Sequence, residues 1–232
     1  MEQTATSRPL TPSSLFLERF LVNNRALLLL GGMLLLALLS RFWELGTRAL
    51  HHDESLHALY SYYLYRDGNY QHNPMMHGPV LFHLTALGYW ISGGASDFTS
   101  RLVPSMLGIL LVWAPWKFRG WLGTSGALVA SALILISPTS LYYSRFIRED
   151  VFAAAWTVLI VYGMWKYLEG GEDFHLYLMT AGWGLLFSQK ETSFLTAFIF
   201  WTFLALVVGL RYTGRLGRQV ALRQMREWHL LV

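Results

Sequence analysis

The chain has no cysteine and little charge. Of its 232 residues only 14% are Asp, Glu, Lys or Arg, whereas a typical soluble domain carries about 25%. The absence of cysteine excludes disulfides and thiolate metal sites. Hydrophobic residues make up 54% of the chain, and the net charge of +4 is not arranged as a basic stripe with interleaved aromatics. We therefore expect a membrane protein and no nucleic-acid partner.

Long uncharged runs recur along the sequence, separated by short charged clusters. About 20 apolar residues cross a bilayer, and shorter runs reach across when flanking charged side chains extend to the interface. We predict an all-α, polytopic membrane protein with about six transmembrane helices. The runs are 20–40 (uncharged from 26), 102–116, 120–144, 151–165, 174–189 and 192–210. No small-residue cleavage site follows the first run, which is interpreted as an uncleaved signal-anchor.

Lysine and arginine predict the orientation of the chain. Most of them fall in segments that share a side with the N-terminus, so both termini are predicted to be cytoplasmic in a multi-pass protein of the plasma membrane. Three regions follow from this reading: a disordered cytoplasmic tail (1–19), a transmembrane module (20–210) and a basic cytoplasmic tail (211–232). The pattern stops inside this last region, which we expect to be truncated.

One long loop, 41–101, is predicted to lie outside the cell. Apolar residues at helical spacing in 55–65 and 79–91 predict two helices there, lying on the membrane surface. Six of the eight histidines fall between His51 and His83. Imidazole and carboxylate oxygen both bind divalent cations, so a metal site in this loop is one interpretation.

The predicted topology brings three charged clusters to the outer face. They are His51-His52-Asp53-Glu54, the stretch from Arg145 to Asp150, and Lys190-Glu191. Charged groups at membrane-embedded positions are costly, which makes them candidates for a functional site. Each cluster also has a purely structural explanation. The acids could cap a helix, the arginines could form surface ion pairs, and the lysine could anchor a helix end.

Together these clusters resemble motifs of the membrane-embedded GT-C glycosyltransferases that use polyprenyl-phosphate sugars. The protein-mannosyltransferase-like and aminoarabinose-transferase-like branches are similar, as are prokaryotic flippase-associated proteins of glycosylation clusters. The resemblance rests on four stretches: His52-Asp53-Glu54-Ser55, His77-Gly78-Pro79, Tyr143 to Asp150 and Gly184 to Glu191. It covers roughly residues 20 to 210. Because family members are usually much longer, the chain would be an N-terminal part.

The resemblance implies catalytic roles for three acids. Asp53 would be the general base, taking a proton from an acceptor hydroxyl as the hydroxyl attacks the anomeric carbon with inversion. Glu54 would position the acceptor or hold Asp53 in place. Asp150 matches the second acidic position of the family.

Binding roles are implied in the same way. Arg145, Arg148 and Lys190 would neutralise the phosphate of the departing lipid. His77 and Glu191 would contact substrate, and since some branches use a divalent metal ion, His77 and Glu54 are its candidate ligands. The expected partners are a polyprenyl-phosphate sugar lipid, the membrane, and an acceptor protein, lipid or glycan.

Two other functions remain open from the sequence. The chain could be part of a flippase or transporter for lipid-linked sugars, or a non-catalytic membrane scaffold. Transporters typically hold their polar groups near the membrane midplane, on broken helices. The clusters in this sequence are predicted at one surface, which favours an enzyme.

Overall fold

The computed structural model describes residues 24–71 and 73–213, and within these residues the secondary structure is helical. The predicted all-α membrane fold is confirmed. The tail predicted at 1–19 lies outside the described residues, as does the part of the 211–232 tail beyond Thr213. The α-helices are α2 (Arg25–Phe42), α3 (His52–Asp67), α4 (Val80–Ser92), α5 (Asp97–Ser100), α6 (Leu102–Lys117), α7 (Arg119–Ile136), α8 (Pro138–Tyr143), α9 (Glu149–Gly170), α10 (Asp173–Phe187) and α11 (Ser193–Thr213), with a short 3-10 turn at Pro74–Met76.

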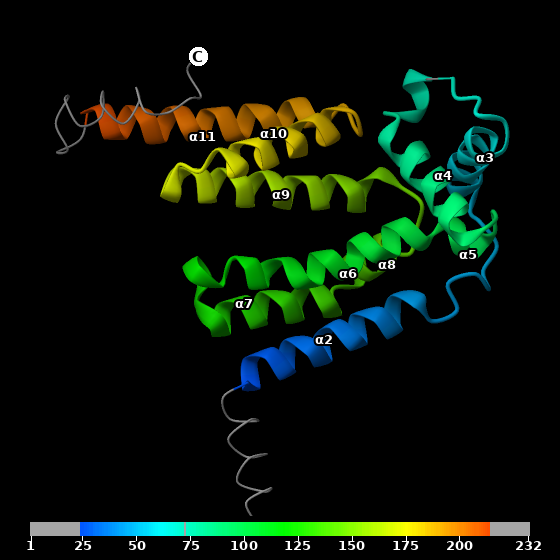
Figure 1. The fold of residues 1–232 in the computed structure, drawn as a ribbon, viewed down its shortest axis with the longest axis horizontal. Helices are drawn as coiled ribbons and strands as arrows, with labels where there is room; N and C mark the ends of the chain where they lie inside the picture. Colours follow the sequence, from blue (N-terminus) through cyan, green and yellow to red (C-terminus); the bar gives the residue numbers. More distant parts are fainter. Residues whose placement is uncertain (1–23, 72, 214–232) are drawn as a thin grey trace, which may run out of the picture.

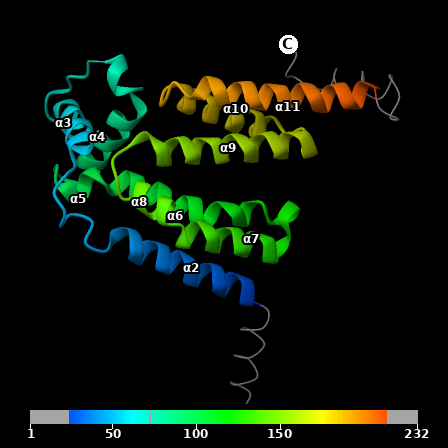
Figure 2. The same ribbon diagram turned by 180° about the vertical axis from the view of Figure 1, so that it is seen from behind.

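The helices form two groups in space. Figure 1 shows α2, α6, α7, α9, α10 and α11 running alongside one another, with α3, α4 and α5 gathered beyond one end of this bundle. The view from behind shows the same arrangement (Figure 2). Both predicted helices of the 41–101 loop are confirmed as α3 and α4. The loop therefore forms a cap on the bundle.

Four helices are long and apolar enough to cross a bilayer: α2, α7, α9 and α11. Two further predicted spans form shorter helices, α6 with 16 residues and α10 with 15. At 1.5 Å per residue they are about 24 and 22 Å long, against a hydrocarbon core of about 30 Å. Both pack against α9 inside the bundle. The six-span count remains a prediction for these two helices.

The run at 120–144 was predicted to be one transmembrane helix, but it forms two helices, α7 and α8. Helix α7 ends at Ile136, and Ser137 adopts an extended backbone with φ −61° and ψ 119°. The cause is Pro138, because a residue before proline is pushed out of the helical region. The Ser137 hydroxyl then accepts the Ser140 N–H at 3.2 Å and begins the short helix α8. A loop, 144–148, then joins α8 to α9 at the capped end.

A buried apolar cluster joins the cap to the bundle. Ala58 from α3 and Leu81 and Phe82 from α4 pack with Ile147 from the 144–148 loop and with α9 residues Val151 and Phe152. All are at most 7% exposed. Burial of each of the five larger side chains contributes about 1.5–3 kcal/mol. The start of α3 is thereby held against the start of α9.

Helices α9 and α10 pack closely at two glycines. A Cβ atom on Gly163 would lie 2.8 Å from the His175 carbonyl oxygen, and one on Gly182 would lie 2.8 Å from Ile160. Small residues of this kind let helix backbones approach one another in membranes. The packing holds α10, and the loop that follows it, beside α9.

Candidate active site

A buried ion pair lies at the junction of the cap and the bundle. The Glu54 carboxylate accepts hydrogen bonds from Arg101 Nε and Nη2, both at 2.8 Å. It also accepts the backbone N–H of His51 at 3.0 Å and that of Ile147 at 3.3 Å. The two side chains are 0% and 2% exposed. One carboxylate thus ties together the first turn of α3, the start of α6 and the 144–148 loop.

The environment of Glu54 keeps this carboxyl ionised. Burial by itself raises the pKa of Glu54, but hydrogen bonds from Arg101 and the His51 backbone, together with the Arg101 charge, outweigh burial and lower the pKa below its ordinary value. Because its oxygens are already engaged by Arg101 and backbone N–H groups, Glu54 is placed as a structural anchor. Sequence reasoning missed Arg101, which looked like one end of an apolar run.

A chain of four charged side chains lies at the surface above this anchor. Arg148 Nη1 is 3.3 Å from Asp53 Oδ2, and Arg148 Nε is 3.8 Å from Asp150 Oδ2. Lys190 Nζ donates to Asp150 Oδ1 at 2.8 Å. The side chains are between 22% and 44% exposed, so solvent and ligands can reach them. The structure therefore brings together members of all three charged clusters, from α3, the 144–148 loop with α9, and the loop after α10.

A second contact joins the loop before α4 to the loop after α10. His77 Nδ1 lies 2.6 Å from Glu191 Oε2, and the Gly78 N–H donates to the Gln189 carbonyl at 3.1 Å. A Cβ on Gly78 would lie 2.0 Å from the Ser188 carbonyl oxygen, so only glycine fits this approach. The pKa of Glu191 lies below its ordinary value because its own backbone N–H and the His77 ring bind the carboxylate. His77 and Glu191 thus form a partly exposed pair next to Lys190.

A buried histidine–carboxylate pair lies beneath the surface chain. His57 Nε2 is 2.9 Å from Glu149 Oε1, while His57 Nδ1 is 2.8 Å from the backbone oxygen of Asp53. A carbonyl oxygen only accepts hydrogen bonds, so Nδ1 is the donor in that contact. Nε2 of the same ring faces the buried Glu149 carboxylate. This pair joins α3, which carries Asp53, to the first turn of α9, which carries Asp150.

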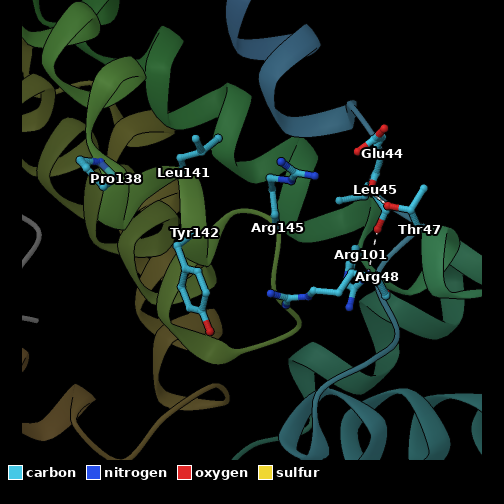
Figure 3. A pocket seen from close by; sticks show the side chains of 9 residues that line it. All are labelled: Glu44, Leu45, Thr47, Arg48, Arg101, Pro138, Leu141, Tyr142 and Arg145. Carbon is cyan, nitrogen blue, oxygen red and sulfur yellow. Dashed lines mark hydrogen bonds between the residues drawn. The ribbon is translucent and has the colours of Figure 1, made fainter.

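Arg145 does not join the other two predicted phosphate ligands. Its Nη2 donates to the backbone oxygen of Trp43, and its side chain lines a cavity of about 450 Å³ between the end of α2 and α8. Figure 3 shows Arg145 and Tyr142 on one wall of this cavity, with Glu44 and Arg48 on the other. The predicted triad of Arg145, Arg148 and Lys190 is therefore divided between two places.

An apolar pocket of about 530 Å³ begins at Asp150. It is lined by residues of α6, α7, α8 and α9, with Asp150 and Tyr143 among its polar members. Asp150, Ala154 and Val158 follow one another at i, i+4 and i+8 and share one face of α9. A second apolar pocket, of about 220 Å³, is also lined by Leu111 and Val158 and continues along α6 and α9 toward the far end of the bundle.

The two proposed metal ligands each contact another side chain. His77 pairs with Glu191, and Glu54 is saturated by Arg101 and backbone N–H groups. Among residues 24–71 and 73–213, no three histidine or carboxylate side chains gather in a way that could hold a metal ion.

One comparison with known proteins gives a match. A family model described as dolichyl-phosphate-mannose-protein mannosyltransferase matches residues 76–216, more than half of the chain. No curated protein and no solved structure matches. The matched region contains Arg148, Asp150 and Lys190 and begins after α3, so Asp53 and Glu54 lie outside it.

Proposed function

Because the chain belongs to the dolichyl-phosphate-mannose-protein mannosyltransferase family, a family of GT-C-type membrane glycosyltransferases, we propose that it transfers a sugar from a polyprenyl-phosphate donor to an acceptor hydroxyl. The family match confirms the resemblance to GT-C glycosyltransferases that the motifs indicated. One observation carries the proposal: Asp53, Arg148, Asp150 and Lys190 are linked by ion pairs, and Asp150 also lines an apolar pocket. A donor with a hydrocarbon tail and a phosphate needs this combination.

The apolar pocket along α9 is the proposed site of the isoprenoid tail. Its volume of about 530 Å³ and the aliphatic side chains in its walls, such as Ile134, Val151 and Val158, suit a hydrocarbon chain. A tail lying along Val158 and Ala154 would place its phosphate beside Asp150. At that point Lys190 and Arg148 lie within 4 Å of Asp150, so their positive charges meet the anionic headgroup.

The two cations are proposed to stabilise the leaving group. When the bond between the anomeric carbon and the phosphate oxygen breaks, its electron pair stays on the phosphate. Arg148 can donate in a fork to two phosphate oxygens, and the Lys190 ammonium adds a compact charge. Donors placed where charge develops stabilise the transition state. Asp150 aligns both cations and gives up part of its pairing when the phosphate binds.

Asp53 is proposed to be the general base. Its carboxylate is 38% exposed and is held by Arg148 at 3.3 Å. The acceptor hydroxyl loses its proton to Asp53 as its oxygen bonds to the anomeric carbon, which inverts that centre. Glu54 and Arg101 fix the first turn of α3, and so the position of Asp53. His77 and Glu191 would bind hydroxyl groups of the substrate.

Lys190→Gln tests the donor site. We expect kcat/KM for the donor to fall about 10- to 100-fold, because a hydrogen bond to a charged group contributes about 1.5–3 kcal/mol. The measurement is transfer from a panel of labelled polyprenyl-phosphate sugars, mannose included, with membranes of the source cells as acceptor. Lys166→Gln is the matched control, since Lys166 also pairs with a carboxylate, Glu169, on α9. Equal transfer by wild type and Lys190→Gln would contradict the donor assignment.

The site is proposed to face the outside of the cell membrane, with both termini in the cytoplasm. The lack of native cysteine makes single-cysteine labelling free of background. In intact cells, a membrane-impermeant maleimide should modify Asn69→Cys, after α3. It should modify Gly120→Cys, at the opposite end of the bundle, only after permeabilisation. The reverse pattern would place the site in the cytoplasm and end this part of the proposal.

A further inference from the structure

The cavity of about 450 Å³ between the end of α2 and α8 belongs to none of the steps above. The Glu54–Arg101 pair adjoins it, since Arg101 lines the cavity and binds Glu54, and Asp53 is not among the lining residues. Its place beyond Phe42, the last residue of α2, puts it at the capped end of the bundle. There it would open among lipid headgroups.

The charges around the cavity are unbalanced. Arg101 is neutralised by Glu54, which leaves Arg48 and Arg145 facing a single carboxylate in the lining, Glu44. Arg48 is 61% exposed and only 3.5 Å from a Glu54 oxygen that already accepts from Arg101. Arg145 is hydrogen-bonded to a backbone carbonyl, and no salt bridge to it is seen among the described residues. Two guanidinium groups are thus available to an anion.

A third arginine, Arg41, lies near the segment that carries Arg145. Arg41 is completely buried, and its Nε and Nη2 atoms have no hydrogen-bond partner among the described residues. It lies four residues before Leu45, which lines the cavity, and α2 ends between the two at Phe42. A Cβ built on Gly108 would lie 3.0 Å from Arg41 Nε and 2.8 Å from the hydroxyl of Ser144, the neighbour of Arg145. The positive potential of the cavity therefore has a buried source as well as exposed ones.

The remaining walls suit an amphiphilic ligand. Leu45, Leu141 and Pro138 are apolar, whereas Thr47 and Tyr142 offer hydroxyl groups. Figure 3 shows the two arginines reaching in from separate segments, so a group bound between them would touch both walls. Planar guanidinium groups match phosphate oxygens in pairs. We propose that this cavity binds the phosphate headgroup of an anionic membrane lipid, separately from the sugar donor.

Lipid retention by the full chain tests this proposal. Purified protein is equilibrated with phosphatidylglycerol or phosphatidylcholine in detergent, and bound lipids are counted by native mass spectrometry. Wild type should retain phosphatidylglycerol in preference to phosphatidylcholine, and Arg48→Gln/Arg145→Gln should retain about tenfold less of it. Arg48→Lys/Arg145→Lys should recover part of the retention, because charge returns without the fork. Lys117→Gln/Arg119→Gln, at the far end of α6, should match wild type.

Three further comparisons make the result decisive. The single variants Arg48→Gln and Arg145→Gln each leave the Glu54–Arg101 pair intact, so an intermediate loss in both supports the site even if the double variant fails to fold. Inorganic phosphate is added to the same proteins, and thermal stabilisation of wild type alone would assign the site to a free phosphate ligand. Equal phosphatidylglycerol retention by wild type and all variants, without stabilisation by phosphate, overturns the proposal. Asp53→Asn should retain phosphatidylglycerol normally, which separates this site from sugar transfer.

Discussion

Asp53→Asn should lose sugar transfer while the protein inserts and folds normally. Removal of a general base typically costs about 10²–10⁴-fold in rate, because the acceptor hydroxyl must then lose its proton to water. The fold should survive, since the contact of Asp53 with Arg148 is half-exposed and such ion pairs contribute about 0–1 kcal/mol. The measurement is the initial rate of transfer from the polyprenyl-phosphate sugar, with membrane insertion followed in parallel.

Asp67→Asn is the matched control for this variant. Asp67 is also an acid of α3 paired with an arginine, Arg66, but it lies at the last turn, away from Arg148. Its replacement should leave transfer at the wild-type rate. If Asp53→Asn also transfers sugar at the wild-type rate, Asp53 is not the base. A flippase component or a membrane scaffold then becomes the better interpretation.

Glu54→Gln should give the largest loss of stability in the cap. The change leaves the Arg101 guanidinium, 2% exposed, without its compensating charge. Breaking a buried pair in this way costs about 3–5 kcal/mol, mostly for the unpaired charge that remains. Thermal unfolding in detergent should show a clearly lower midpoint. Glu172→Gln changes an exposed carboxylate, so its unfolding midpoint should equal that of wild type.

A second variant separates the charge penalty from a loss of shape. Glu54→Leu/Arg101→Leu removes both charges, so it should be more stable than Glu54→Gln. An equally low midpoint for both proteins would show that backbone contacts of Glu54, to His51 and Ile147, matter more than its charge.

The same carboxyl predicts how stability depends on pH. The folded-state pKa of Glu54 is lowered, so the unfolded chain takes up its proton first as the pH falls. Its contribution to stability is therefore complete above the ordinary pKa of a glutamate. It is lost as the pH falls through the lower, folded-state pKa. Glu54→Gln should lack this acid-dependent component.

The meeting of distant charged residues could be predicted from the sequence. Apolar runs of membrane length force the chain to alternate sides, so clusters separated by an even number of spans return to one face. Asp53, Asp150 and Lys190 do lie at one end of the bundle, linked through Arg148. The helices α3 and α4 of the cap could also be predicted, because the spacing of apolar residues along a helix is a local property of the sequence.

The sequence could not separate Asp53 from Glu54. Adjacent residues of a helix point about 100° apart, and either acid could have faced the cap interior. Packing of α3 against Phe82, Ile147 and Phe152 turned Glu54 inward, where it met Arg101. Arg145 and Arg148 diverged for a related reason. Both were expected to bind the same phosphate, but they occupy the loop between α8 and α9, where no helix fixes them on one face.

The sequence by itself determined that the protein belongs in a membrane, which segments become helices, and the end of the bundle at which charge accumulates. All three follow from local properties of the chain: apolar side chains are stable in hydrocarbon, whereas charged groups and unpaired backbone groups are costly there. Only the tertiary structure decided which charges are buried anchors and which stay accessible. The partner of Glu54 is 47 residues away, and its choice depends on how α3, α6 and the 144–148 loop pack together. No local pattern encodes that packing, because the desolvation of a charge depends on everything that surrounds it.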